Sequence, residues 1–109
     1  MKFNIYFTPE FEKQLKKLLK KYKTLSKDLE ALVKHLETNP TTGTPLGKNC
    51  YKIRLAISSK GKGKSGGARV ITCVLVAAEE VYLADIYDKS EQGNISNKRL
   101  KELAQGIQQ

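Results

Sequence analysis

The N-terminal part of the chain shows two hydrophobic periodicities in succession. Residues 2–7 (KFNIYF) alternate apolar and polar side chains, which predicts a short, half-buried strand. Thr8 and Pro9 then provide a capping hydroxyl and a first-turn proline, a typical start for a helix. Apolar residues recur at helical spacing over residues 9–22, so we expect an amphipathic helix whose lysines mainly face solvent.

A second helical stripe follows after a few residues. We expect Ser26 to cap this helix and Asn39, followed by Pro40, to end it. Its apolar stripe comprises Leu29, Leu32, Val33 and Leu36. Because the connection is short, the two helices should form an antiparallel hairpin. The next segment, TNPTTGTPLGKN, is rich in proline and glycine and is interpreted as a loop.

The second half of the chain switches to strand patterns. The first run alternates, with Lys52 and Arg54 on one face and apolar residues on the other. The second run is apolar on both faces, which is typical of a central strand. These features predict an antiparallel meander of strands at residues 51–58, 68–77 and 81–88.

The chain should end in a helix that Ser96 caps and Ile95 staples. The resulting order, β-α-α-β-β-β-α, indicates an α+β fold in which an antiparallel sheet packs against a helical hairpin. A chain of 109 residues suits a single domain over residues 1–109. We expect the hairpin to cover one sheet face and to leave the Lys52 and Arg54 face open as the floor of a basic groove.

Composition changes this picture chiefly through the distribution of charge. The formal net charge is +9, and residues 38–78 contain no Asp or Glu. An ordinary solvated surface mixes both signs, so this stretch favours a polyanionic partner over a role in solubility alone. Its basic residues are Lys48, Lys52, Arg54, Lys60, Lys62, Lys64 and Arg69.

Other features of the sequence exclude several classes of protein. The N-terminus lacks the pattern of a signal peptide, and no run approaches the ~18 apolar residues of a transmembrane helix, so we expect a cytoplasmic protein without a membrane partner. Cys50 and Cys73 lack CxxC spacing and neighbouring histidines, which argues against zinc. We interpret both as reduced, buried thiols rather than a disulfide. No cofactor is expected.

The segment SKGKGKSGG (residues 59–67, here called the basic loop) contains the only string that suggests a nucleotide-binding motif. Gly63-Lys64-Ser65 resembles the end of a Walker motif, but Ser58 stands where the motif needs its first glycine. A strand also follows where the motif needs a helix. We therefore expect a mobile loop whose lysines lie along a phosphate backbone as movable charges.

Five residues are expected to converge where the strands end: Lys52, Arg54, Arg69, Tyr87 and Lys89. The one histidine, His35, lies off the apolar stripe of its helix and far from this region. A metal-dependent nuclease needs clustered carboxylates, which the basic region lacks. RNA carries its own nucleophile in the 2′-OH, so lysine, arginine and tyrosine would suffice to orient the phosphate, stabilise its charge and move protons.

The strings CYKIRLAISSKGKGKSGGARVITCV and VYLADIYDKSE resemble the RelE/HigB-type toxins of bacterial type II toxin–antitoxin modules, in the RelE/ParE superfamily. The resemblance implies a RelE-like fold, metal-independent mRNA cleavage in the ribosomal A site, and a cognate antitoxin. The implied partners are thus the antitoxin, the ribosome and mRNA. The implied catalytic residues are Lys52, Arg54, Arg69, Tyr87 and Lys89, and the implied RNA- or ribosome-binding residues are Lys60, Lys62 and Lys64. Lys48, which belongs to the same acid-free stretch, is expected to join this binding group.

Two other functions stay open at this point. A ParE-like toxin shares the fold but inhibits DNA gyrase by binding protein, and such a target does not require an acid-free stretch. A non-catalytic RNA-binding module would bind RNA in a salt-dependent way without cutting it. The low aromatic content disfavours a stacking platform for single strands.

Overall fold

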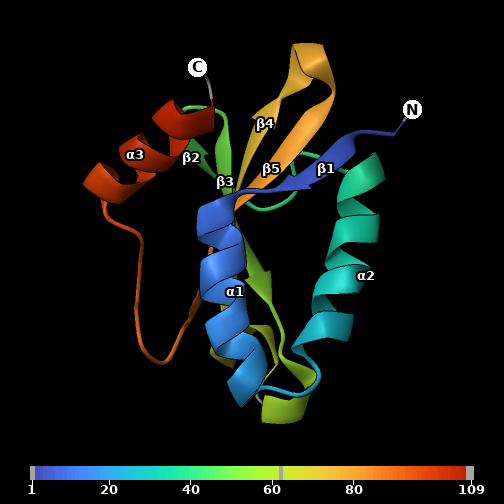
Figure 1. The fold of residues 1–109 in the computed structure, drawn as a ribbon, viewed down its shortest axis with the longest axis vertical. Helices are drawn as coiled ribbons and strands as arrows, with labels where there is room; N and C mark the ends of the chain where they lie inside the picture. The colour runs from blue at the N-terminus through green and yellow to red at the C-terminus, as the bar shows by residue number, and fades with distance from the viewer. Residues whose placement is uncertain (1, 62, 108–109) are drawn as a thin grey trace.

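The computed structural model describes residues 2–61 and 63–107 as a twisted sheet with helices on both faces (Figure 1). Lys62 lies outside the described residues. The helices and strands follow in the order β1 (Asn4–Phe7), α1 (Pro9–Lys21), α2 (Leu25–Thr38), β2 (Thr44–Gly47), β3 (Cys50–Leu55), β4 (Ala68–Leu75), β5 (Glu80–Asp88) and α3 (Asn97–Ile107). Short 3-10 turns lie at Ser58–Lys60, Lys64–Gly66 and Val76–Ala78. The predicted α+β class is confirmed.

The five strands form one sheet in the order β1-β5-β4-β3-β2. The predicted antiparallel meander is present as β3, β4 and β5. The expectation of a wholly antiparallel sheet is wrong, because β1 pairs with β5 in parallel, with Ile5 opposite Val81. The meander leaves one edge of β5 unpaired, and β1 supplies the backbone partners that this edge requires.

The segment interpreted as a loop contains an additional short strand, β2, which pairs with β3 at the other edge of the sheet. Pro45 has no N–H to donate, and an edge strand is the position in a sheet where this is tolerated. Lys48 and Asn49 connect β2 to β3 with φ angles of 56° and 63°, the left-handed conformation that tight hairpins need. The hairpin places Lys48 at an exposed turn.

Helix α1 begins as predicted, because the Thr8 hydroxyl accepts the Phe11 N–H at 3.1 Å. The prediction that Ser26 caps α2 is wrong, since the helix already includes Leu25. The preceding residue, Thr24, provides no side-chain cap either, because its hydroxyl donates to Asp28 at 3.1 Å. The predicted C-terminal boundary at Asn39 is confirmed.

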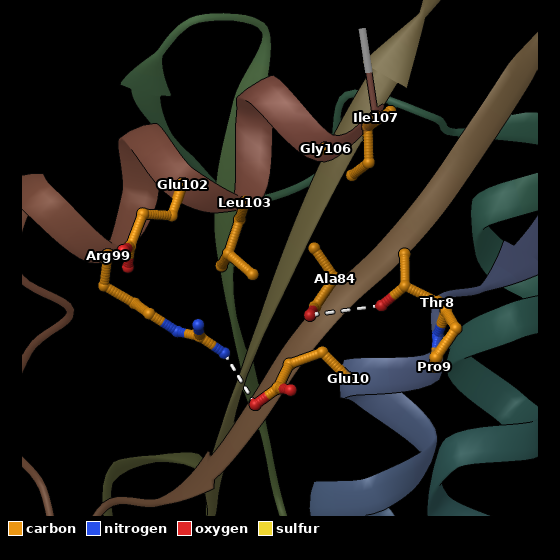
Figure 2. Close-up of a pocket in the computed structure, with 9 residues that line it drawn as sticks. All are labelled: Thr8, Pro9, Glu10, Ala84, Arg99, Glu102, Leu103, Gly106 and Ile107. Atoms are coloured by element: carbon orange, nitrogen blue, oxygen red, sulfur yellow. Dashed lines mark hydrogen bonds and ion pairs between the residues drawn. The ribbon is translucent and has the colours of Figure 1, made fainter. Parts of the chain in front are cut away.

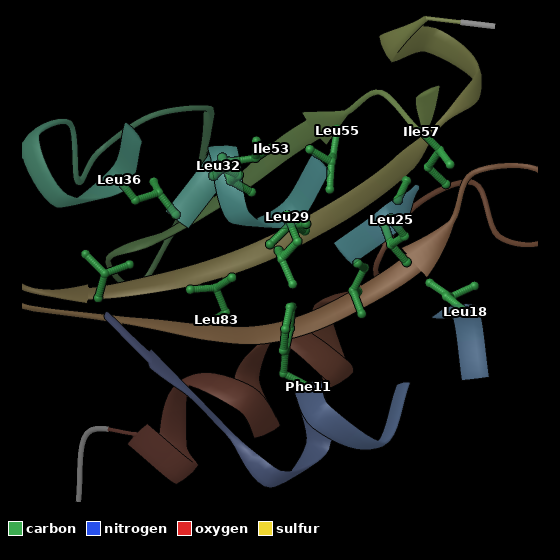
Figure 3. Close-up of a cluster of buried hydrophobic side chains, with 14 of the residues drawn as sticks. Phe11, Leu18, Leu25, Leu29, Leu32, Leu36, Ile53, Leu55, Ile57 and Leu83 are labelled. Atoms are coloured by element: carbon green, nitrogen blue, oxygen red, sulfur yellow. The ribbon is translucent and has the colours of Figure 1, made fainter. Parts of the chain in front are cut away.

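Helices α1 and α2 cover one face of the sheet and form the larger core with it (Figure 3). The predicted alternation along β3 is confirmed, since Ile53 and Leu55 point into this core. Burial of each large aliphatic side chain contributes about 1.5–3 kcal/mol relative to exposure. The helices contribute Phe11, Leu18, Leu25, Leu29, Leu32 and Leu36, and the strands contribute Ile53, Leu55, Val70, Val74, Val81, Leu83 and Ile86.

The opposite face of the sheet is partly covered by α3. Its residues Leu100, Leu103 and Ala104 pack on a smaller core. The predicted cap is confirmed, because the Ser96 hydroxyl accepts the Arg99 N–H at 3.1 Å. The expectation of a fully open face is therefore wrong. The physical reason is that this face also carries apolar strand residues, which α3 removes from water: Cys50, Ile71, Cys73 and Ala84.

Cys50 and Cys73 are buried as expected, but they form a disulfide rather than two free thiols. The register of β3 and β4 places them directly opposite each other on the α3 face. Paired residues on neighbouring strands bring their side chains close enough to bond. The disulfide lies under α3 and ties together the two strands that carry Lys52, Arg54 and Arg69.

Candidate nucleic-acid interface

Three predicted site residues lie in one row across the sheet. The register pairs Arg54 of β3 with Arg69 of β4, and Arg69 with Tyr87 of β5. Because opposite residues on neighbouring strands have Cβ atoms about 4.5–5.5 Å apart, the row is compact. Lys52 stands two residues before Arg54 and therefore shares its face. We call these four residues the cationic row.

Arg69 is the buried member of the cationic row, with 4% of its surface exposed. One terminal nitrogen of its guanidinium donates to the backbone carbonyls of Lys64 and Ala68, at 2.9 and 3.1 Å, and the other donates to that of Ser65 at 3.3 Å. Within the described residues no carboxylate lies within ion-pairing distance of this cation. Arg69 thus holds the end of the basic loop and places a buried positive charge within the cationic row.

Tyr87 is also buried, with 7% of its surface exposed. Burial raises the pKa of its hydroxyl above the ordinary value, although the nearby charge of Arg69 and the Ile95 N–H oppose the rise. That N–H does not reach hydrogen-bonding geometry, and no atom of the described chain satisfies the Tyr87 hydroxyl. The hydroxyl therefore stays protonated at neutral pH and has a hydrogen bond to offer.

Two predicted site lysines contact the segment between β5 and α3. The Lys52 Nζ donates to the Asn94 side chain at 3.3 Å, and the Lys89 Nζ donates to the Gly93 carbonyl at 3.4 Å. Arg54 is exposed. These contacts bring Lys89 and Lys52 to one segment, residues 89–96, which borders the cationic row.

The described part of the basic loop, residues 59–61 and 63–67, makes more contacts than its glycines predict. It contains 3-10 turns, and Lys60 donates to Asp88 at 2.9 Å and to the Gly66 carbonyl at 2.8 Å. At its start, the Ser59 N–H donates to the Thr24 hydroxyl at 2.9 Å. The expectation of a mobile loop overlooked these tertiary contacts, and Lys60 is engaged in them. Of the predicted binding residues, Lys48 and Lys64 are exposed, and Lys62 lies outside the described residues.

Sequence reasoning missed the buried carboxylates that surround the interface. Asp88 lies at the end of β5 and is 1% exposed. Asp85, also buried, accepts the Ile86 N–H at 2.9 Å and lies 3.9 Å from Arg99. A detectable signal was the occurrence of two aspartates inside an otherwise apolar strand pattern, since buried carboxylates require partners.

A partly apolar pocket lies away from the cationic row, between α3 and the start of α1 (Figure 2). It measures about 430 Å³, and its walls include Pro9, Leu103 and Ile107. Glu10 accepts from Arg99 at 2.8 Å on one side, and Glu102 stands beside that pair. Carboxylates at the rim make this pocket a poor phosphate site, so the basic face is the better candidate for nucleic acid.

The described residues contain neither a metal-binding cluster nor a membrane-spanning helix. Within residues 2–61 and 63–107, no three His, Cys, Asp or Glu side chains gather closely enough to hold a metal ion. None of the helices described is long and apolar enough to cross a membrane. His35 is exposed on α2, as predicted.

Comparisons with known proteins identify a matching family model and a solved structure with the same fold. The family model for the RelE toxin of the RelE/RelB toxin–antitoxin system matches residues 5–108. Among solved structures, a mutant of the Escherichia coli toxin RelE in the free state superposes with a TM-score of 0.63 and 18% identity. The superposition covers 98% of this chain and 99% of that one. At this identity, the structural match establishes the shared fold alone.

Proposed function

Because the chain belongs to the RelE toxin family, we propose that it blocks translation by cutting mRNA on the ribosome. RelE toxins pair with RelB-type antitoxins, and the cognate antitoxin would silence this one. The observation that carries the proposal is the cationic row, in which Arg54, Arg69 and Tyr87 stand on adjacent strands. A row of cations with an unsatisfied tyrosine hydroxyl suits an RNA phosphate that develops negative charge.

Arg54, which is exposed, and Lys52, which is half-buried, make the first contacts in this proposal. Arg54 binds the phosphoryl oxygens through its planar fork, which matches phosphate geometry. Lys52 lies about two strand positions away, so its ammonium reaches an adjacent oxygen or the attacking 2′-OH. Held in line, the 2′-OH loses its proton to water and attacks the neighbouring phosphorus to form a 2′,3′-cyclic phosphate. The bond to the 5′-oxygen of the next nucleotide breaks, and that oxygen leaves and takes up a proton.

The buried members act after the 89–96 segment moves. Arg69 contributes a fixed positive charge beneath the phosphate, and Tyr87 donates its proton in a hydrogen bond to a phosphoryl or leaving oxygen. Because the pKa of Tyr87 is raised, the hydroxyl serves as a donor rather than a base. Lys89 anchors the segment that covers this hydroxyl, through its bond to Gly93.

The test is cleavage of a defined mRNA on programmed ribosomes, mapped by primer extension. Arg54→Ala should lower the cleavage rate about 100-fold, the usual loss on removing one donor to a developing oxyanion. Lys34→Ala removes the same charge from an exposed position on α2 and should leave the rate unchanged. Equal rates for the two variants would contradict the assignment of Arg54.

The same assay separates the two alternatives. Intact mRNA accompanied by DNA damage in cells would favour a ParE-like inhibitor of gyrase. RNA binding that weakens with salt, without cleavage even on translating ribosomes, would favour a non-catalytic RNA-binding module. Codon-phased cuts are expected only from a ribosome-dependent endonuclease.

A further inference from the structure

Asp88 is the most heavily satisfied side chain near the interface, and it stands on the sheet face opposite the cationic row. Its side chain is fully buried. It accepts hydrogen bonds from the Tyr22 hydroxyl of α1, from the Lys60 Nζ at 2.9 Å, and from the Ser90 N–H and hydroxyl at 3.0 and 2.7 Å. One carboxylate therefore connects a helix, the basic loop and the segment that follows β5.

The Lys60 ammonium is directed into the protein in this arrangement, not toward a phosphate at the surface. Its Nζ donates to Asp88 and to the Gly66 carbonyl, and it lies 5.1 Å from the centre of the Tyr22 ring. The side chain is only 11% exposed. Two hydrogen bonds and an aromatic ring therefore surround an ammonium that is largely withdrawn from solvent.

The Lys60 contact reaches the cationic row through the backbone of the basic loop. Lys60 holds Gly66, and the two preceding residues, Lys64 and Ser65, present the carbonyls that Arg69 binds. Displacing this turn would therefore remove two of the three carbonyl partners of the Arg69 guanidinium and leave the Ala68 carbonyl of β4. The first turn of the loop has a separate support, because Asp28 accepts both the N–H and the hydroxyl of Ser58, at 3.0 and 2.6 Å.

We propose that Asp88 is a positioning residue that holds the basic loop through Lys60, so that the loop supports Arg69, and that Lys60 is a structural tether rather than an RNA contact. The loop is thus pre-organised before RNA arrives, which leaves Lys64 as the exposed described lysine of the loop. The inference about catalysis rests on the proposed function, whereas the tether itself does not.

The tether is tested by hydrogen exchange in the free protein, which requires no RNA. Four variants are compared: Asp88→Asn, Lys60→Met, the double variant, and Lys34→Met as a matched loss of charge on α2. We expect faster exchange in residues 57–66 for both single variants, without a further increase in the double variant, because both remove the same link. Residues 70–75 of β4 report global opening and serve as the internal reference.

The double variant keeps the experiment informative if a single variant unfolds. Lys60→Met leaves the buried carboxylate with only the exposed Lys21, at 3.8 Å, as a described cation, whereas the double variant also removes the carboxylate charge. Two results would contradict the proposed tether. One is an increase in exchange of the basic loop no larger than that of β4, and the other is an increase in the double variant equal to the sum of the increases in the two single variants. Lys34→Met should leave both segments unchanged.

The catalytic consequence is tested by cleavage on programmed ribosomes with ribosome concentration varied. Displacing the support of Arg69 should lower the rate at saturating ribosomes about tenfold in both Asp88→Asn and the double variant, with little change in half-saturation. If Lys60 is instead an RNA contact, Lys60→Met and the double variant will weaken half-saturation while Asp88→Asn will not. If the wild type cuts no mRNA, the proposed function fails while the exchange result still decides the tether.

Discussion

Arg69 on β4 lies directly opposite Tyr87 on β5, and both are nearly buried on the sheet face that also carries the exposed Arg54. Among the described residues, the Arg69 guanidinium binds only backbone carbonyls and therefore keeps its full charge. No described atom satisfies the Tyr87 hydroxyl, which therefore keeps its donor. These two buried groups are fixed by the fold, so little reorganisation is needed when charge develops above them. The exposed Arg54 and the half-buried Lys52 would supply the initial attraction for RNA.

Replacing Arg69 should affect stability as well as activity. Arg69→Ala leaves the carbonyls of Lys64, Ser65 and Ala68 without their donor, and each lost bond to a charged group costs about 1.5–3 kcal/mol at most. Arg69→Lys keeps the charge but loses the planar fork, so we expect it to recover only part of the stability. Urea denaturation measures the free energy of unfolding of both Arg69 variants. The control Lys34→Ala should remain within about 0.5 kcal/mol of the wild type. Equal stability of all variants would show that these bonds do not support the loop.

Gly67 provides a purely steric prediction at the junction of the basic loop and β4. A Cβ atom at this position would lie 2.1 Å from the Leu55 carbonyl oxygen, which belongs to the backbone of the neighbouring strand and cannot turn aside as a flexible side chain could. Gly67→Ala should therefore destabilise the fold by about 1–3 kcal/mol, the usual cost of overpacking. Gly93→Ala is the matched control, because nothing lies within 4 Å of its added Cβ. Equal melting temperatures for the two variants in thermal denaturation would contradict the close approach of β3 and the basic loop.

The pairing of Cys50 with Cys73 could have been predicted, whereas the place of Asp88 could not. The alternation along residues 51–58 correctly separated Lys52 and Arg54 from the core residues. Once Arg54 is opposite Arg69, moving four residues along both strands brings Cys50 opposite Cys73. The contact of Asp88 with Lys60, however, depends on how the basic loop folds back toward α1, and no local periodicity encodes that path. The position of α3 over the second face likewise depends on tertiary packing.

The disulfide predicts a dependence of stability on redox conditions. The bridge closes a segment with a sequence separation of 23, and a loop of that size should contribute about 3 kcal/mol by restricting the unfolded chain. Dithiothreitol should therefore lower the urea midpoint of the wild type. The double variant Cys50→Ala and Cys73→Ala should show a low midpoint that dithiothreitol does not change. A wild-type midpoint that is insensitive to complete reduction would contradict a stabilising role for the bridge.

Asp88 and Asp85 stand on the same strand and should affect stability with opposite signs. Burial raises the pKa of Asp88, but hydrogen bonds from Tyr22, Lys60 and Ser90 outweigh it and hold the pKa below the ordinary value. Burial raises the pKa of Asp85, and the nearby Arg99 only partly counters it. A depressed folded pKa stabilises the fold above the unfolded value of about 3.9, whereas a raised one destabilises the fold at neutral pH.

The paired variants make this difference measurable. Asp88→Asn should lower stability at pH 7, and its deficit should shrink as the pH falls below about 4 toward the folded pKa. Asp85→Asn should raise stability at pH 7, because its amide oxygen can still accept the Ile86 N–H, and the gain should vanish as the pH falls through the folded pKa to about 4. The charged neighbours differ accordingly: Lys60 and Lys21 face Asp88, while Arg99 and Glu10 face Asp85. Urea denaturation between about pH 3 and pH 8 gives both curves, and changes of the same sign at pH 7 would mean that the environment of one carboxyl has been misassigned.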